Sequence, residues 1–106
     1  ILFLKKHSME TYKKIDIDLA ACMINDTDPV VVDIRDVDSF EAGHIEGAIN
    51  LSNNNIKDFI SNTEKNRSII VCCYHGNSSK SVANFLTECG FLDVYSLNGG
   101  YEEWKK

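Results

Sequence analysis

Apolar residues along this chain follow two different periods. Residues 30–32 and 69–71 are continuous β-branched runs, which predict strands buried on both faces of a parallel sheet. Residues 79–89 instead carry apolar side chains at positions i, i+3, i+4 and i+7, which predicts a helix with one apolar face that ends at Gly90. These side chains are Val82, Phe85, Leu86 and Cys89. A strand, a loop and a helix are therefore expected between residues 68 and 90.

The same two patterns alternate along the rest of the chain. Further strands are expected at residues 12–15 and 91–97, and glycine-bounded residues 43–47 predict a tight turn that leads into another strand. Helices are expected where apolar residues return at helical spacing after a polar start, at residues 17–24, 37–41, 56–60 and 101–106. Strands that alternate with helices predict an α/β fold with a mostly parallel sheet of about five strands.

The first eight residues stand apart from this pattern. Apolar residues precede Lys5 and Lys6 there, which is the reverse of the order in a secretory signal peptide. We take Met9 as the natural start and expect residues 1–8 to be left over from cloning or disordered, with an extra edge strand as the alternative. A chain of 106 residues fits one domain, and we expect it at residues 9–106.

Composition narrows the classes of partner. The 11 basic and 16 acidic residues give a net charge of −5, and no basic run exceeds two residues, so we expect neither nucleic acid nor an anionic membrane as a partner. The apolar stretches are far shorter than the roughly 18 residues that span a bilayer. Four cysteines without a CxxC pair predict reduced thiols and a cytoplasmic location.

Cys73 is the strongest candidate for chemistry. It comes just after the apolar run at 69–71 and begins a small polar loop that leads into the predicted helix. Unpaired N–H groups and the dipole at a helix N-terminus favour negative charge, and such sites lower a thiol pKa from about 8.5 to about 3.5–7.5. Gly76 permits a positive φ, so successive amides of the loop can turn inward as an anion-binding nest. We therefore predict a nucleophilic thiolate at Cys73.

Charged residues end the other buried strand. Asp33 and Arg35 follow the run at 30–32, and parallel strands place them at the same sheet edge as Cys73. Arg35 is a candidate for steering an anion and Asp33 for pinning backbone amides, with a solvated turn and a surface ion pair as the alternative. His44 lacks a nucleophilic or metal-spaced partner, so we expect it to be a buried, hydrogen-bonded structural residue.

Two other cysteines are expected to serve in packing. Cys22 lies on the predicted helix that follows Asp16, where a thiol behaves as a small apolar side chain. Cys72 should point to the opposite face of its strand from Cys73 and lie in the core, and regulation of Cys73 by Cys72 is left open.

Three separated motifs, together with the closing Gly99-Gly100-x-x-x-Trp104, resemble a single-domain rhodanese. The motifs are Val31-Val32-Asp33-Ile34-Arg35-Asp36, Gly43-His44-Ile45-x-Gly47-Ala48 and Cys73-Tyr74-His75-Gly76-Asn77-Ser78. The last of them, continued by Ser79 and Lys80, is similar to the loop of the GlpE-type thiosulfate sulfurtransferases. The resemblance covers about residues 12–104. It implies a rhodanese-like fold, a five-stranded parallel sheet with helices on both faces.

The resemblance also implies an activity. In such enzymes a cysteine, here Cys73, attacks the outer sulfur of thiosulfate, and sulfite leaves. The resulting persulfide passes its sulfur to cyanide or to a thiol, for example that of thioredoxin, and neither a metal nor an organic cofactor is needed. The site loop runs from Cys73 to Ser78, with Arg35 and Lys80 as electrostatic additions. Its other residues are Tyr74 and His75 at the rim, Gly76 and Asn77, and Ser78 and Ser79, whose hydroxyls bond the persulfide or cap the helix.

Other functions fit the loop less well. A cysteine phosphatase or arsenate reductase of related fold needs a longer loop with an arginine, and Lys80 cannot reproduce the arginine fork. A nucleotide-binding P-loop needs a glycine just before the lysine, where this chain has Ser79. A non-catalytic rhodanese-like binding module usually lacks the cysteine. A purely apolar role for Cys73 fits poorly with its polar, glycine-containing loop.

Overall fold

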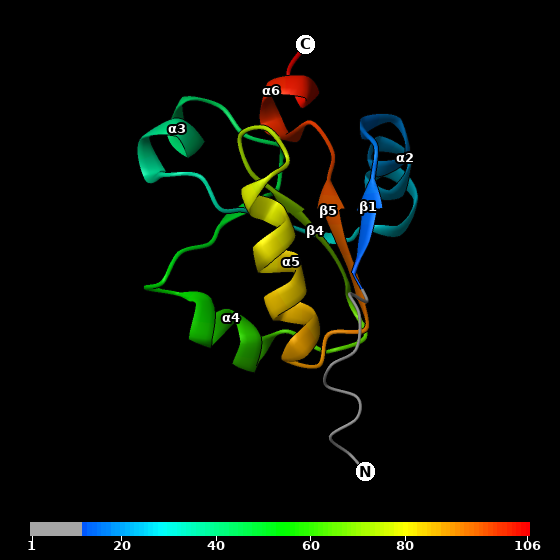
Figure 1. Ribbon diagram of the computed structural model, residues 1–106, viewed down its shortest axis with the longest axis vertical. Coiled ribbons are helices and arrows are strands. Elements are labelled where there is room, and N and C mark those ends of the chain that lie inside the picture. Colours follow the sequence, from blue (N-terminus) through cyan, green and yellow to red (C-terminus); the bar gives the residue numbers. More distant parts are fainter. Residues whose placement is uncertain (1–11) are drawn as a thin grey trace.

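Five parallel strands form the centre of the molecule, in the spatial order β1-β5-β4-β2-β3 (Figure 1). The computed structural model describes residues 12–106, and every strand pair in that part of the chain is parallel. The strands are β1 (Lys13–Ile15), β2 (Val30–Asp33), β3 (Ile49–Asn50), β4 (Ser68–Cys72) and β5 (Asp93–Leu97). The predicted α/β fold with a parallel sheet of about five strands is confirmed.

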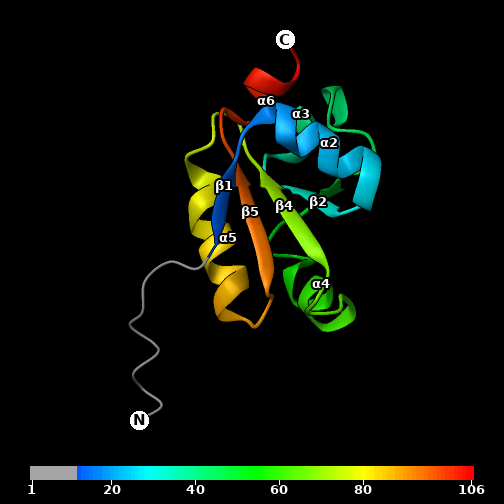
Figure 2. The ribbon, with the colours of Figure 1, turned by 90° about the vertical axis from the view of Figure 1, so that its right-hand side faces the viewer.

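Helices cover both faces of the sheet (Figure 2). α4 (Ile56–Asn62) and α5 (Ser78–Glu88) lie on one face, and α2 (Ile17–Thr27) lies on the other. The central strand β4 serves both layers, because Ile69 and Val71 pack toward α5 while Ile70 and Cys72 pack toward α2. This arrangement explains the continuous apolar run of β4, since a side chain on either face is removed from water. Each such aliphatic side chain contributes about 1.5–3 kcal/mol when fully buried.

The carboxyl ends of the strands meet at one edge of the sheet. Two short helices, α3 (Val37–Ala42) and α6 (Gly100–Trp104), lie at this edge beside the loop that joins β4 to α5 (Figures 1 and 2). Because the strands are parallel, segments that are distant in the sequence converge there. The candidate chemistry of Cys73 and of Asp33 and Arg35 is therefore carried on one edge.

Several local expectations were wrong. Of the four residues expected on the apolar face of α5, Leu86 is buried and Val82 and Cys89 are half-buried against the core, whereas Phe85 is 45% exposed. Cys22 is exposed on α2 rather than packed. His44 is exposed as well, although it is hydrogen-bonded as expected. In each case a local pattern marks a helix or a turn correctly but cannot tell how that element is rotated against the sheet.

His44 keeps a structural role at the surface. Its Nδ1 lies 2.7 Å from the carbonyl oxygen of Phe40, and its ring stacks on the Phe40 ring with a centroid separation of 3.8 Å. The hydrogen bond and the stacking together hold the turn that contains His44 against the end of α3. The hydrogen-bonded role is confirmed, and burial is not.

The expectation for residues 1–8 lies outside the described residues. Within residues 12–106, no helix is both long and apolar enough to cross a membrane.

Candidate active site

Cys73 lies at the bottom of a cradle of backbone amides. It follows β4 directly, and the chain then turns through Gly76 into α5. The Cys73 Sγ accepts hydrogen bonds from the amides of Gly76 and Ser79, each at 3.2 Å, and the residue is only 3% exposed. Gly76 has a φ of +94°, a backbone conformation that disfavours other residues. The inward-turned amides that the sequence predicts are therefore present.

These contacts favour the anion of Cys73. Burial raises the pKa of the thiol, but the Ser79 hydroxyl and the amides of Ser79, Gly76 and His75 lower it, and the pKa lies below its ordinary value. The neighbouring Cys72 lacks such donors, and burial raises its pKa to about 12. Two adjacent thiols thus differ in charge preference, because only one of them faces the cradle.

Apart from Gly76 and Ser79, the residues of the loop point to solvent. Tyr74, His75, Asn77 and Ser78 are exposed, whereas Gly76 and Ser79 are buried. The outward direction expected of Tyr74 and His75 is observed. The Ser79 Oγ lies 2.7 Å from the Ser96 Oγ on β5, and no side-chain hydrogen bond caps the start of α5, so the expected capping by Ser78 or Ser79 is wrong. Lys80 is half-buried in the first turn of α5.

The first turn of α6 holds the outer side of the cradle. The Tyr101 amide donates to the carbonyl oxygen of Cys73 at 2.8 Å, and the Glu102 amide donates to that of Tyr74 at 3.0 Å. A peptide unit directs its C=O and N–H to opposite sides, so carbonyls that are held outward leave the following amides directed inward. The amide that follows the Tyr74 carbonyl is that of His75, which is one of the groups that lower the pKa of Cys73, so this donor is oriented by a segment about 30 residues further along the chain.

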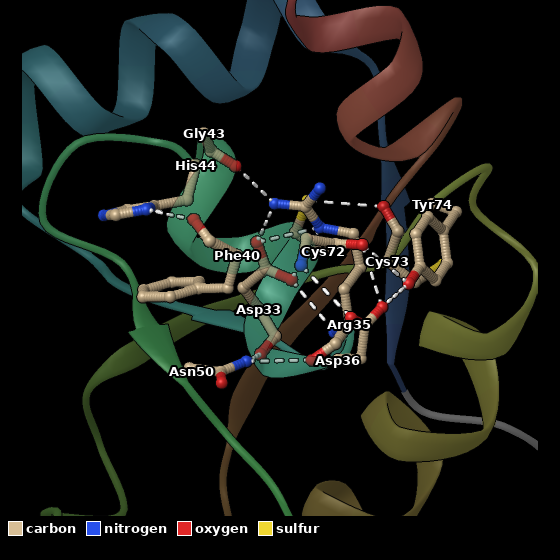
Figure 3. Close-up of polar contacts among 11 residues, drawn as sticks. Asp33, Arg35, Asp36, Phe40, Gly43, His44, Asn50, Cys72, Cys73 and Tyr74 are labelled. Carbon is tan, nitrogen blue, oxygen red and sulfur yellow. Dashed lines mark hydrogen bonds and ion pairs between the residues drawn. The ribbon is translucent and has the colours of Figure 1, made fainter.

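Asp33 and Arg35 form a buried ion pair beside this loop (Figure 3). The Arg35 guanidinium donates from Nε to Asp33 Oδ1 at 3.0 Å and from NH2 to Asp33 Oδ2 at 2.8 Å, and NH2 also donates to the Gly43 carbonyl oxygen at 2.7 Å. The Asp33 carboxylate raises the pKa of Arg35 above its ordinary value. Asp33 also accepts the Arg35 amide at 3.0 Å, so its expected role in pinning an amide is confirmed.

Arg35 does not lie free to steer an anion. Its side chain is only 4% exposed. The guanidinium carbon lies 4.2 Å from the centre of the Tyr101 ring and 5.7 Å from that of the Tyr74 ring. These contacts tie the end of β2 to the two segments that form the cradle. Because Asp33 already neutralises the charge, the placement of Arg35 supports the loop rather than a ligand, and the surface ion pair of the alternative reading is wrong as well.

A second link joins the start of α3 to the loop after β4 at the surface. The Tyr74 hydroxyl donates to Asp36 Oδ1 (Figure 3). It also lies 3.1 Å from the Ser39 Oγ. Asp36 also caps α3, because its Oδ2 accepts the Ser39 amide at 3.1 Å. The bonds from Tyr74 and Ser39 lower the pKa of Asp36 to about 2.

Residues 16–106 match the family model of the rhodanese-like domain. The chain belongs to the rhodanese-like family. A protein named thiosulfate sulfurtransferase GlpE from Shewanella oneidensis is 44% identical over 91% of this chain and 95% of its own length. Another protein of that name, from Pseudomonas fluorescens, is 47% identical over 92% of this chain and 88% of its own length. The crystal structure of a rhodanese-related protein from Thermoplasma volcanium superposes with a TM-score of 0.76, at 26% identity over 89% of this chain and 91% of that one.

Three residues of this rhodanese-like domain support the site in roles that the sequence did not assign to them. Gly43 offers its carbonyl oxygen to Arg35, and Ser96 contacts Ser79. The Asn50 Nδ2 donates to the carbonyl oxygens of residues 33 and 35 at 3.0 and 2.9 Å, which fixes the turn after β2. Only Ser96 gave a signal in the sequence, because it is a serine in the otherwise largely apolar run of β5. The other two act through contacts that no local pattern encodes.

Proposed function

We propose that this chain is a thiosulfate sulfurtransferase that carries the transferred sulfur on Cys73. The observation that carries the proposal is the pair of 3.2 Å hydrogen bonds from the amides of Gly76 and Ser79 to the Cys73 Sγ. An activated thiolate and a set of fixed donors are what sulfur transfer from an anionic donor requires. The names of the curated relatives support the same reaction.

The first half of the reaction loads the sulfur. The Cys73 thiolate attacks the outer sulfur of thiosulfate, a new S–S bond forms, and the S–S bond within thiosulfate breaks with its electron pair leaving on sulfite. The charge on the protein remains at the sulfur, now as a persulfide anion. The amides of Gly76 and Ser79 therefore serve both states of the cysteine, and no proton needs to be removed by a base at this step.

The second half transfers the sulfur onward. Cyanide or a thiolate attacks the outer sulfur of the persulfide, the S–S bond to Cys73 breaks, and the thiolate returns. Cyanide leaves as thiocyanate, and a thiol leaves as its own persulfide. The exposed Tyr74, His75, Asn77 and Ser78 surround the cradle on the loop, so an acceptor meets polar side chains there. A dithiol protein such as thioredoxin is an acceptor of this class.

Mass spectrometry tests the proposal directly. The protein is incubated with thiosulfate, digested without reductant, and fragmented to separate Cys72 from Cys73. We expect one added sulfur atom on Cys73, its loss on addition of cyanide, and thiocyanate in the same amount. Cys22→Ser is the matched control and should load normally, because the exposed Cys22 lies on α2. Sulfur on Cys22 or Cys89 instead, or no added sulfur, would contradict the proposal.

A further inference from the structure

The two amides that donate to the Cys73 sulfur are held in place in different ways. Ser79 lies in the first turn of α5, so the helix fixes its amide. Gly76 lies in the loop before α5, and within residues 12–106 the bond from its amide to the sulfur is the only hydrogen bond that it makes. The position of the Gly76 amide therefore depends on what its backbone packs against.

Gly76 packs against the turn between β5 and α6. A Cβ atom on Gly76 would lie 2.8 Å from the amide nitrogen of Gly99 and 3.1 Å from the carbonyl oxygen of Leu97, and both are backbone atoms. Gly76 thus contacts the sulfur through its amide and the turn through its Cα, with no space left between its Cα and the turn. An outward shift of the turn would free the Gly76 amide to move away from the sulfur.

Asn98, the first residue of this turn, ties it to the start of α2. Its amide donates to the Ile15 carbonyl oxygen at 2.8 Å, and its Nδ2 donates to Asp16 Oδ1 at 2.8 Å. Asp16 occupies the N-cap position of α2, where a carboxylate ordinarily accepts a bond from the first turn of its own helix. Within the described part of the chain its side chain makes no such bond and accepts from Asn98 instead. The carboxylate therefore serves the turn beside the cradle rather than the end of α2.

We propose that Asn98, anchored on Asp16, is a positioning residue that keeps the Gly76 amide against the sulfur. The contacts run from the anchoring pair through the turn to Gly76, and neither Asp16 nor Asn98 bonds the sulfur itself. A donor that is already fixed stabilises an anion without reorganisation, so the position of the turn matters for the thiolate and for a persulfide alike. The consequence for sulfur transfer rests on the proposed function, whereas the effect on the Gly76 amide and on the thiolate does not.

The Asp16 carboxylate also carries a charge, and loss of the charge and loss of the anchor act in opposite directions. A negative charge disfavours a nearby thiolate, so its removal alone lowers the pKa of Cys73 or leaves it unchanged. Loss of the anchor weakens a donor to the thiolate and raises that pKa. Asp16→Asn removes the charge but keeps an oxygen that accepts from Asn98, whereas Asp16→Ala removes both. A comparison of these two variants therefore separates the anchor from the charge.

NMR reports on the two donors separately. As Cys73 ionises in a pH titration, the amide protons of Gly76 and Ser79 should both move to higher chemical shift, because a hydrogen bond to an anion is stronger. Movement that persists in Cys73→Ser comes from other groups, such as the neighbouring His75, and is subtracted. In Asn98→Ala we expect the movement of Gly76 to fall by roughly half or more, because a hydrogen bond weakens steeply when its geometry is lost. The movement of Ser79 should remain, since α5 still holds its amide.

Alkylation by iodoacetamide measures the Cys73 thiolate without any sulfur donor, with the label located by fragment mass spectrometry. At pH values below the wild-type midpoint, Asn98→Ala should react roughly two- to fivefold more slowly than the wild type, and the wild-type rate should return at high pH. Asp16→Ala should be slower than Asp16→Asn by a similar factor. Asn84→Ala is the matched control, because it removes an amide that donates to a carboxylate within α5, that of Glu88, and it should change neither readout.

A double-mutant cycle tests whether the anchoring pair acts as one unit. In the Asn98→Ala background, Asp16→Ala should have no further effect on the Gly76 amide. Independent effects, an equal loss of movement at Gly76 and Ser79, or an unchanged Gly76 amide in both single variants would refute the proposal. If Asn98→Ala does not fold, the comparison of Asp16→Ala with Asp16→Asn decides by itself. If the expected results are found but thiosulfate loads no sulfur onto Cys73, the proposed function fails and the positioning role stands.

Discussion

Gly100 lies directly against the carbonyl oxygen of Cys73. A Cβ atom on Gly100 would lie 2.5 Å from that oxygen and equally close to the backbone of Tyr74. This absence of a side chain lets the first turn of α6 reach the loop and donate the Tyr101 amide to Cys73. The geometry of the cradle therefore depends on a glycine that lies outside the loop from Cys73 to Lys80.

Gly100→Ala should both destabilise the fold and impair the site. Its φ of +61° costs about 1–2 kcal/mol for a non-glycine residue, and overpacking against the loop adds about 1–3 kcal/mol. Urea unfolding measures the loss, and thiosulfate-dependent thiocyanate formation should fall with it. Gly47→Ala is the control, since Gly47 has a φ of +85° with no atom within 4 Å of the added Cβ. This variant should cost only the about 1–2 kcal/mol that a positive φ costs a non-glycine residue. Equal losses in both variants would contradict the close contact.

Arg35→Ala should destabilise the protein by about 3–5 kcal/mol, because it leaves the Asp33 carboxylate buried without its partner. Lys13→Ala breaks the exposed pair with Asp93 and should cost less than about 1 kcal/mol. Urea unfolding at neutral pH compares the two. A stable Arg35→Ala variant whose only defect is weaker thiosulfate binding would restore the anion-steering role.

Tyr74→Phe should raise the pKa of Asp36 from about 2 toward its ordinary value, because the phenol is the largest cause of the lowered pKa. The Ser39 bonds remain and should keep the pKa below that value. In the wild type, the stability that Asp36 contributes is present above its unfolded pKa and is lost as the pH falls through about 2. In Tyr74→Phe the pKa is lowered less, so Asp36 should contribute less stability, and that contribution should be lost at a higher pH. NMR titration of the Asp36 carboxyl carbon measures the pKa. Tyr95→Phe, on β5, should leave Asp36 unchanged, and an unmoved pKa in Tyr74→Phe would refute the link.

Cys73→Ser should lower thiocyanate formation by roughly a thousandfold or more, because an alcohol is not ionised at neutral pH and cannot hold a persulfide. Urea unfolding should show a stability close to that of the wild type. Cys72→Ser provides a contrast, since that side chain points into the core and away from the cradle. Retained turnover in Cys73→Ser would exclude this residue as the sulfur carrier.

Aryl phosphates should not be hydrolysed. The loop from Cys73 to Lys80 contains no arginine, and the nearby Arg35 is buried against Asp33. Phosphoryl chemistry on such a loop relies on a bidentate clamp that lysine does not supply. The release of nitrophenol from p-nitrophenyl phosphate should match that of Cys73→Ser. A rate that depends on Cys73 would favour the phosphatase reading.

The features that could be read from the sequence have short-range physical causes. A β-branched run followed by a polar, glycine-containing loop and a helical period places Cys73 at the end of a strand and the start of a helix, whatever the rest of the chain does. That local geometry predicts inward amides and the outward direction of Tyr74 and His75, and the contacts with α6 then hold the loop in this conformation. The α/β alternation likewise follows from periods of a few residues.

The tertiary structure decided what each side chain meets. Ser79 and Ser96 are 17 residues apart in the sequence and meet because β4 and β5 are neighbours under α5. The rotation of α2 and α5 against the sheet determines that Cys22 and Phe85 are exposed, and hydrophobic periodicity does not specify that rotation.

Arg35 shows most clearly the difference between what local sequence predicts and what tertiary contacts add. The sequence places a charged pair at the end of β2, at the edge that carries Cys73. Only the tertiary structure decided that this pair is buried, because the α3 turn brings Gly43, and α6 brings Tyr101, over the guanidinium. Local sequence sets backbone conformation through sterics and hydrogen bonding within a few residues. The charge, access and orientation of the site depend on strand order, which brings distant segments together around Cys73.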